Sequence, residues 1–162
     1  MTDRIETTRF IPAAAADIFS VLTDPQGHVA IDATGMLQDA DGERVTAPGD
    51  TFVVHMDRES LNDIPDYGTY DTTVTIRDFE PDALISWWAV GRIKPGIGHF
   101  YGYRLEPVDE SEPGTLVTSF YDWSEISDEW RAAGIFPVVS ETALSGTLGI
   151  LDRTVRRGYP RG

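Results

Sequence analysis

The sequence predicts an α+β fold in which a curved antiparallel sheet of about seven strands wraps around a long C-terminal helix. The order of the segments indicates this: helical residues near the start, an uninterrupted run of strand-like segments, then an amphipathic helix over residues 134–157. Every connection between the strand-like segments is short enough to join antiparallel neighbours. A helix that follows such a meander must bury its apolar side against the sheet, because little else is left to cover it.

The N-terminal region is predicted to hold one strand and two short helices. Residues 4–11 alternate enough to form an opening strand. Pro12 suits the first turn of a helix, since that turn needs no amide hydrogen from it. We therefore expect a first helix over residues 13–22 and one further helical turn over residues 26–31.

The middle of the chain has the alternation and β propensity of strands. Residues 36–39 and 43–46 flank Asp41-Gly42, a pair typical of a two-residue hairpin because both positions tolerate positive φ. The segment 84–90 is apolar on both faces, which predicts a central place in the sheet. The remaining strands are expected at residues 51–57, 69–79, 98–105 and 115–123.

The C-terminal helix is interrupted near Pro137, which cannot donate the backbone hydrogen bond of a helix interior, so the helix begins or bends there. Gly146 and Gly149 each lower helix propensity by about 1 kcal/mol relative to alanine. We expect them to allow a close approach to the sheet. One apolar face runs along the helix through Leu144, Leu148, Leu151 and Val155.

Length and composition indicate one domain that spans residues 1–162. The absence of cysteine excludes disulfides and thiolate chemistry. The chain shows no signal peptide and no stretch of the ~18 apolar residues that span a membrane, so we expect a cytoplasmic location. Lys94 is the only lysine beside twelve arginines, a composition typical of a GC-rich bacterial gene.

The net charge of −14 predicts repulsion of nucleic acid and of anionic lipid, and it favours neutral apolar ligands or basic partners. The sequence has no glycine-rich phosphate loop, no nucleophile elbow and no zinc-binding helix motif. Its acidic residues do not follow the spacing of a calcium-binding loop. We therefore expect no cofactor and no metal ion.

Aromatic residues are concentrated on three consecutive predicted strands, where large side chains with a polar tip suit a cavity that holds and orients a hydrophobic ligand. The alternative is an ordinary aromatic core. Strand alternation is expected to direct most of these side chains inward, toward the long helix. The residues are Trp87, Trp88, Tyr101, Tyr103, Tyr121 and Trp123.

Several short strings occur in a characteristic order: IPA at residues 11–13, DIFSVLTDP at 17–25, FEP at 79–81, LISW at 84–87, YRLEP at 103–107, TLVT at 115–118 and YDWS at 121–124. Together they resemble the START-like, helix-grip (SRPBCC) superfamily, particularly its bacterial polyketide cyclase/dehydrase and lipid-transport branch. The resemblance implies a ligand-binding domain with the helix-grip fold, and it implies a possible gate to the cavity at residues 61–67. It identifies no reaction, because the members range from lipid carriers and cyclases to hormone binders and chaperone regulators.

The predicted ligand-binding residues combine the inward faces of the strands with the apolar face of the helix. They are Phe52, Val54, Met56, Ile76, Ile85, Trp87, Tyr101, Tyr103, Ser119, Tyr121, Trp123, Leu144 and Leu148. The candidate catalytic residues are His99, Tyr101 and Tyr103, because His99 shares strand parity with the two tyrosines and histidine is the natural acid or base near neutral pH.

Three other titratable residues are given structural roles. His55 alternates with the apolar residues of its strand and is expected to face solvent, and His28 is expected in an early turn. For all three histidines, a solvated or hydrogen-bonded surface position is the alternative to a catalytic one. Asp122 is expected on the outer face, exposed or capped; burial there would raise its pKa.

Three functions remain open. The first is the binding or transport of a hydrophobic or amphipathic small molecule that is lipid-like, sterol-like or polyketide-like. The second is an aromatase/cyclase or dehydratase that acts on a polyketide-like substrate through the candidate catalytic residues. The third is a protein-binding module that resembles the activators of a heat-shock ATPase and uses the acidic exterior. A homodimer is also left open.

Overall fold

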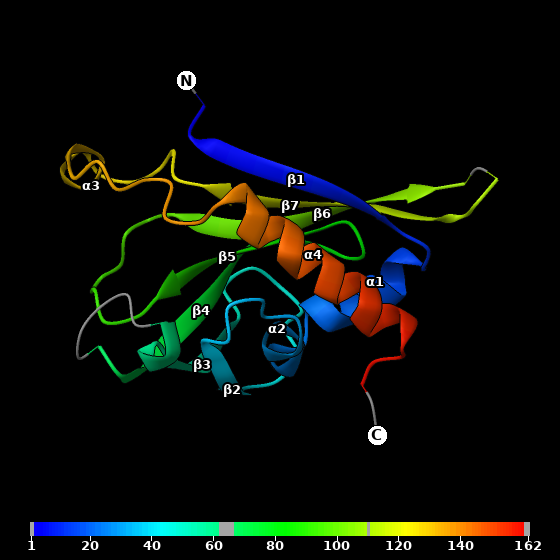
Figure 1. Ribbon diagram of the computed structural model, residues 1–162, viewed down its shortest axis with the longest axis horizontal. Helices are drawn as coiled ribbons and strands as arrows, with labels where there is room; N and C mark the ends of the chain where they lie inside the picture. The colour runs from blue at the N-terminus through cyan, green and yellow to red at the C-terminus, as the bar shows by residue number, and fades with distance from the viewer. Residues whose placement is uncertain (1, 62–66, 110, 161–162) are drawn as a thin grey trace.

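The structure is a computed structural model of the 162-residue chain, and it describes residues 2–61, 67–109 and 111–160. A seven-stranded antiparallel sheet curves around helix α4 (Glu141–Arg156), with strand order β1-β7-β6-β5-β4-β3-β2 (Figure 1). The predicted α+β fold is confirmed, including the central position of β5. The strands are β1 (Arg4–Ile11), β2 (Leu37–Asp41), β3 (Thr51–Asp57), β4 (Thr69–Glu80), β5 (Leu84–Val90), β6 (Phe100–Val108) and β7 (Gly114–Asp122).

Two short helices, α1 (Ala15–Leu22) and α2 (Pro25–Ala30), follow β1 as predicted. The Asp24 carboxylate caps α2 by accepting a hydrogen bond from the backbone of Gln26 at 3.1 Å. Gly27 lies directly against the end of α1, since a Cβ atom at this position would be 1.8 Å from the Val21 carbonyl oxygen. Only glycine fits at this position, where α2 packs against the end of α1.

The connection between β2 and β3 corrects the predicted hairpin at Asp41-Gly42. β2 pairs with β3 itself, and residues 42–50 form a loop in place of a strand at 43–46. Val45 is buried, and its N–H donates to the Thr23 carbonyl at 3.0 Å. The Asp50 carboxylate accepts hydrogen bonds from the backbone of residues 46 and 47, so a side-chain turn replaces the ladder that a hairpin would form.

Helix α4 begins at Glu141, seven residues later than the first residue of the predicted helix. Residues 134–140 are not helical, and the Ser140 hydroxyl caps α4 by accepting a hydrogen bond from the Ala143 N–H at 3.1 Å. The predicted apolar face is present, since Leu144, Leu148 and Leu151 are buried.

The two glycines of α4 do not serve the close approach that the sequence suggested. A Cβ atom at Gly146 would meet the Ala33 side chain at 3.7 Å, and one at Gly149 would meet Arg9 at 3.9 Å. Both are ordinary van der Waals distances. The expectation was wrong because the larger side chains on the buried face set the distance between α4 and the sheet.

Ion pairs join α4 to β1, the strand at one edge of the sheet. The buried Asp152 carboxylate accepts a hydrogen bond from Arg9 of β1 at 2.8 Å and one from Arg156, a turn later in α4, at 2.7 Å. The helix also contacts α1 and β7. The C-terminal half of α4 is therefore held by both packing and charge.

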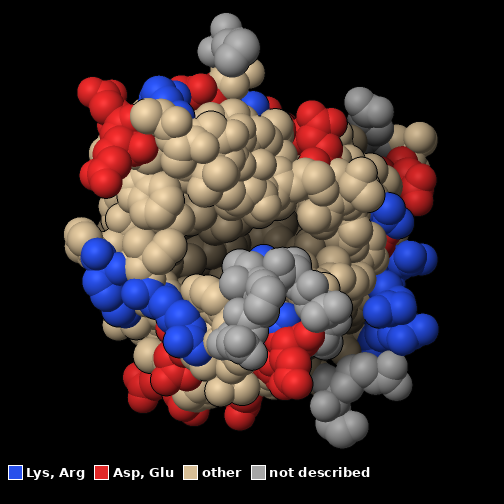
Figure 2. All heavy atoms as spheres, turned by 60° about the vertical axis from the view of Figure 1, so that its left-hand side comes forward, with Lys and Arg blue, Asp and Glu red and all other residues tan. Residues whose placement is uncertain are grey.

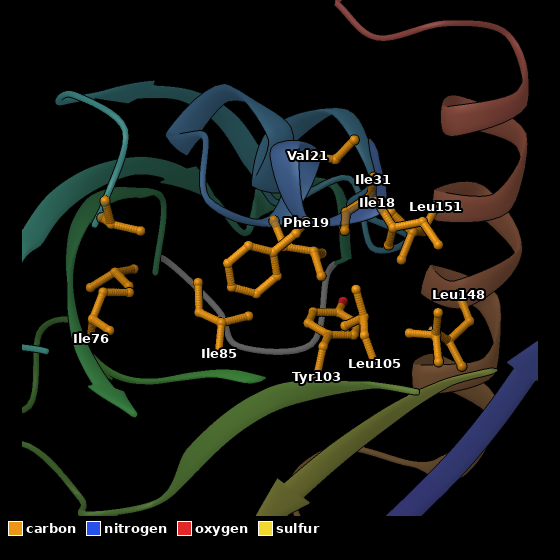
Figure 3. Packing of buried hydrophobic residues seen from close by; sticks show 14 of the residues in the cluster. Ile18, Phe19, Val21, Ile31, Ile76, Ile85, Tyr103, Leu105, Leu148 and Leu151 are labelled. Atoms are coloured by element: carbon orange, nitrogen blue, oxygen red, sulfur yellow. The ribbon is translucent and has the colours of Figure 1, made fainter. Parts of the chain in front are cut away.

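Buried apolar residues form two clusters. In the main core, Phe19 of α1, Ile85 of β5 and Leu151 of α4 point toward one another (Figure 3). The second cluster lies beside helix α3 (Asp128–Ala132) and consists of Tyr121, Trp123, Ile126 and Leu144, with Trp130, Phe136 and Val139 packed against it. Within the described ranges, no helix combines the length and apolar character that crossing a membrane requires.

Candidate ligand-binding site

A cavity of about 250 Å³ lies between the inner face of the sheet, the α2 region and the N-terminal half of α4. Figure 2 shows a hollow among uncharged residues on this side of the molecule. Most of the lining residues are apolar, and a smaller number are polar. The lining residues are His28, Ile31, Asp32, Thr34, Met36, Leu37, Val54, Met56, Thr72, Val74, Trp87, Ala89, Tyr101, Gly102, Tyr103, Ser119, Phe120, Val139, Ala143, Leu144 and Thr147.

Strand register brings the aromatic wall together. Trp87 of β5 pairs with Tyr101 of β6, and Tyr103 of β6 pairs with Ser119 of β7. The rings of Trp87 and Tyr101 are stacked, with centroids 6.2 Å apart and an interplanar angle of 20°. These side chains line the cavity opposite α4, so the predicted inward orientation of these strand faces is confirmed.

The two tyrosine hydroxyls in this wall are protonated at neutral pH. Burial raises the pKa of Tyr101 to about 12, and burial raises the pKa of Tyr103 further. Ser119, which pairs with Tyr103 across β6 and β7, acts in the opposite direction on the pKa of Tyr103 but does not outweigh burial. Both phenols can therefore donate a hydrogen bond to a ligand, and neither supplies a base.

The structure divides the thirteen predicted ligand-binding residues between the cavity and the packed interior. Seven line the cavity: Val54, Met56, Trp87, Tyr101, Tyr103, Ser119 and Leu144. The other six are covered by neighbouring side chains, with Phe52, Ile76, Ile85 and Leu148 in the main core and Tyr121 and Trp123 in the second cluster. A side chain on the inner face of the sheet lines the cavity only if it is left uncovered by α1 and by the C-terminal half of α4.

His99 is buried in the second cluster and is not among the residues that line the cavity. Its Nδ1 atom lies 2.5 Å from the Tyr121 hydroxyl oxygen, and its ring meets Phe136 edge-on at 6.0 Å. Loss of hydration lowers the pKa of His99 to about 4, so the ring is neutral at pH 7. Of the three catalytic candidates, only Tyr101 and Tyr103 reach the cavity.

His28 lies in α2, within the predicted helical turn, but it is not at the surface: only 8% of its surface is exposed, and it lines the cavity. Its Nε2 atom is 2.9 Å from the Leu22 carbonyl oxygen. Phe52 and Trp87 enclose the ring edge-on, with centroids 5.0 and 4.8 Å away. Desolvation lowers the pKa of His28 to about 4, which keeps it neutral at pH 7.

The sequence analysis also missed four polar residues of the lining: Asp32, Thr34, Thr72 and Thr147. The Asp32 carboxylate accepts hydrogen bonds from Thr34 and from the backbone of Leu37, which closes the turn between α2 and β2. The Thr147 hydroxyl donates to the Ala143 carbonyl within α4. Asp32 and Thr34 lie in a turn, where periodicity gives no signal of a site. Thr72 shares strand parity with Val74 and Ile76, so alternation could have placed it on the inner face.

Two titratable residues occupy the opposite face of the sheet. His55 faces outward as predicted, 2.6 Å from the Asp41 carboxylate and 2.7 Å from that of Asp71, and these hydrogen bonds raise its pKa to about 9. Asp122 is buried and capped, with hydrogen bonds from Ser124 and Arg4. Burial acts to raise the pKa of Asp122, but these hydrogen bonds outweigh it and the pKa is lowered, contrary to our expectation for a buried carboxyl.

The predicted gate at residues 61–67 falls largely outside the described residues, since 62–66 are not described. At its described end, the Tyr67 ring meets that of Tyr70 edge-on at 4.8 Å, and the Arg92 guanidinium lies 4.8 Å from the Tyr67 centroid. The described residues contain no group of three or more histidine or acidic side chains arranged to hold a metal ion.

No protein-family model and no curated protein matches the chain. Solved structures match nearly all of it. A protein from Chromobacterium violaceum has a TM-score of 0.69 and 13% identity, with 94% of this chain and 97% of that chain covered. The Aha1 dimer from Colwellia psychrerythraea has a TM-score of 0.59 and 18% identity, with 96% and 98% covered. A point mutant of norcoclaurine synthase from Thalictrum flavum, in complex with a transition-state analogue, has a TM-score of 0.58 and 15% identity, with 97% of this chain and 96% of that chain covered.

These similarities define the class of fold. The chain has the helix-grip fold of START-like proteins, and the resemblance predicted from its sequence is confirmed at the level of the fold. Because the identities are low, they carry no statement about ligand or reaction.

Proposed function

We propose that the protein binds and carries a hydrophobic or amphipathic small molecule in the cavity between the sheet and α4. The observation that supports this proposal is the cavity itself, with its mainly apolar lining drawn from both the sheet and the helix. Apolar walls with a few separate polar groups are typical of sites that desolvate a ligand and then orient it. The phenols of Tyr101 and Tyr103 would supply the orienting hydrogen bonds.

The cavity volume narrows the class of ligand. About 250 Å³ is below the ~300–1,000 Å³ typical of sites for drug-sized ligands. This size favours a compact compound of one or two rings, such as a small polyketide-like molecule, over a sterol or a long-chain lipid. The aromatic wall of Trp87 and Tyr101 suits a flat ligand.

Titration with 6-propionyl-2-(dimethylamino)naphthalene, a neutral two-ring dye whose emission moves to shorter wavelength in apolar surroundings, tests the proposal. We expect saturable binding to the wild-type protein. Ala143→Phe places a ring in the cavity and should abolish this binding, because Ala143 lines the cavity from α4. The control is Ser145→Phe, which adds the same ring at an exposed position two residues away.

Equal dye binding by both variants would locate the dye elsewhere and contradict the proposal. Absence of saturable binding by the wild-type protein would contradict it as well. Circular dichroism of both variants checks that the fold is retained.

A second candidate function is catalysis in the same cavity, as an aromatase/cyclase or dehydratase. The protonated hydroxyls of Tyr101 and Tyr103 favour it, because such donors can polarise a substrate carbonyl. A solved neighbour, norcoclaurine synthase, is an enzyme with this fold. If a polyketide-like substrate is turned over, Tyr101→Phe and Tyr103→Phe should each lower kcat; unchanged turnover in both would remove this candidate.

A third candidate is activation of a partner protein, as the Aha1 neighbour and the net charge of −14 suggest. It requires salt-sensitive association with a basic partner. The internal cavity disfavours it, because a module that uses only its exterior needs no open interior. Association that does not change with salt concentration would exclude it.

A further inference from the structure

The neutral imidazole of His28 is held in one orientation by its surroundings. Its Nε2 atom lies 2.9 Å from the carbonyl oxygen of Leu22. A carbonyl oxygen can only accept a hydrogen bond, so Nε2 carries the hydrogen and Nδ1 presents a lone pair. The rings of Phe52 and Trp87 pack edge-on against the imidazole and prevent it from rotating freely.

The lone pair of Nδ1 faces the cavity. In the part of the chain that the structure describes, every fully buried side-chain nitrogen or oxygen has a hydrogen-bond partner. The Nδ1 atom of His28 has no such partner there, so it is not sealed from solvent, and the opening that the described residues show beside this nearly buried ring is the cavity that it lines. The cavity therefore contains a hydrogen-bond acceptor, Nδ1 of His28, that has no partner among the described residues.

The other side chain of the lining that can only accept hydrogen bonds is already engaged. The Asp32 carboxylate accepts hydrogen bonds from Thr34 and from the Leu37 backbone. Hydroxyl groups can also turn to donate or accept, whereas Nδ1 of a neutral histidine only accepts. His28 is thus the group that requires a hydrogen-bond donor on the ligand.

We propose that His28 is a specificity-determining residue, whose Nδ1 atom accepts a hydrogen bond from an uncharged alcohol or phenol group on the ligand. This inference rests on the proposed function and names the chemistry that the cavity selects. A ligand without a donor leaves Nδ1 desolvated and unpaired, and that costs affinity. In this arrangement the hydroxyl group of the ligand lies deep in the cavity, beside Trp87, and the apolar body of the ligand extends toward α4.

The test compares 2-naphthol with 2-methoxynaphthalene, which has the same ring system but no hydrogen to donate. Calorimetric titration should show that 2-naphthol binds about two- to tenfold more tightly, as expected for one hydrogen bond. The Nδ1 resonance of ¹⁵N-labelled His28 should move on addition of 2-naphthol and not on addition of the ether. The resonances of His55 and His99 serve as internal controls in the same spectra.

His28→Phe should reduce the affinity for 2-naphthol to that for the ether, while His55→Phe, the same change on the outer face, should leave the preference intact. The ligand comparison on the wild-type protein stands by itself if His28→Phe does not fold. Binding of both compounds with equal affinity and an unmoved Nδ1 resonance would overturn this inference and leave the proposed function in place. Binding of neither compound would overturn both.

Discussion

The Nδ1 atom of His99 lies 2.5 Å from the hydroxyl oxygen of Tyr121, deep in the second cluster. Tyr121 is fully buried, and its ring centroid is 4.9 Å from that of Tyr101, which lines the cavity. The His99–Tyr121 pair thus forms a layer behind the cavity wall. Both rings of the pair contact the Tyr101 ring, since the His99 centroid is also 5.5 Å from it.

Tyr121→Phe should lower the free energy of unfolding by about 1–3 kcal/mol, because it leaves a buried nitrogen of His99 without its partner. Urea denaturation followed by tryptophan fluorescence measures this change. The control is Tyr67→Phe at a partly exposed ring, where we expect a change within about 0.5 kcal/mol. Equal stability of Tyr121→Phe and the wild-type protein would show that the bond contributes nothing.

His55 makes the stability of the protein sensitive to alkaline pH. Its pKa is raised to about 9 by Asp41 and Asp71, while an unfolded chain has the ordinary value near 6.5. A raised pKa in the folded protein gives a contribution that is complete below pH 6.5, declines as the pH rises to 9 and is lost above it. Because all three groups are exposed, added salt should reduce the effect.

Proton NMR titration of the His55 ring measures this pKa directly. Asp71→Asn and Asp41→Asn should each move it down toward 6.5, and the difference in melting temperature between the wild-type protein and His55→Gln should shrink between pH 6.5 and 9. A wild-type pKa near 6.5 would contradict the ion pairs seen on the outer face of β3.

Two glycines should respond to alanine substitution in opposite directions. Gly146→Ala should raise stability by up to about 1 kcal/mol, since the new methyl group fits and alanine favours the helix. Gly102→Ala should lower stability by several kcal/mol, because its Cβ would lie 2.6 Å from the Ile85 carbonyl oxygen and 2.4 Å from the Phe120 ring. Thermal denaturation of both variants decides this, and a melting temperature that changes in the same direction for both would refute it.

Asp152→Asn should lower the free energy of unfolding by about 1–3 kcal/mol, because the side chain loses its charge-assisted hydrogen bonds with Arg9 and Arg156. The effect stays moderate because both arginines are partly exposed to solvent. Chemical denaturation measures this loss. The control is Glu43→Gln, which removes a charge at an exposed position. A loss no larger than that of the control would mean that packing alone holds α4.

Local pattern was sufficient to predict the strands and the buried face of α4. Alternation placed Trp87, Tyr101 and Tyr103 on the inner face because each side of a strand has a fixed environment over its length. The hairpin at Asp41-Gly42 was wrong, because the Asp50 side chain and the Thr23 carbonyl satisfy the backbone of residues 45–47 in a loop. The contact with Thr23 joins residues far apart in the sequence, and the turn at Asp50 depends on a single side chain, so neither leaves a periodic signal.

The candidate site could be predicted from the sequence less completely than the strands. His28 lies on a six-residue helix, too short for a clear period, and its burial depends on the contact between Gly27 and the end of α1. Whether an inward residue such as Ile85 opens onto the cavity depends on which helix covers it, a property of the assembled layers. The strand faces could therefore be predicted, while the boundary between core and cavity could not.

The attachment of α4 has a mechanical consequence. Its C-terminal half is anchored by Leu148, Leu151 and Asp152, while the first two turns, with Ala143 and Leu144, form a wall of the cavity. If α4 tilted about its anchored half, the cavity would widen while the Arg9 ion pair stayed in place. Such a tilt would have to separate Leu144 from the second cluster, so the contacts of this one side chain would set the cost of opening the cavity.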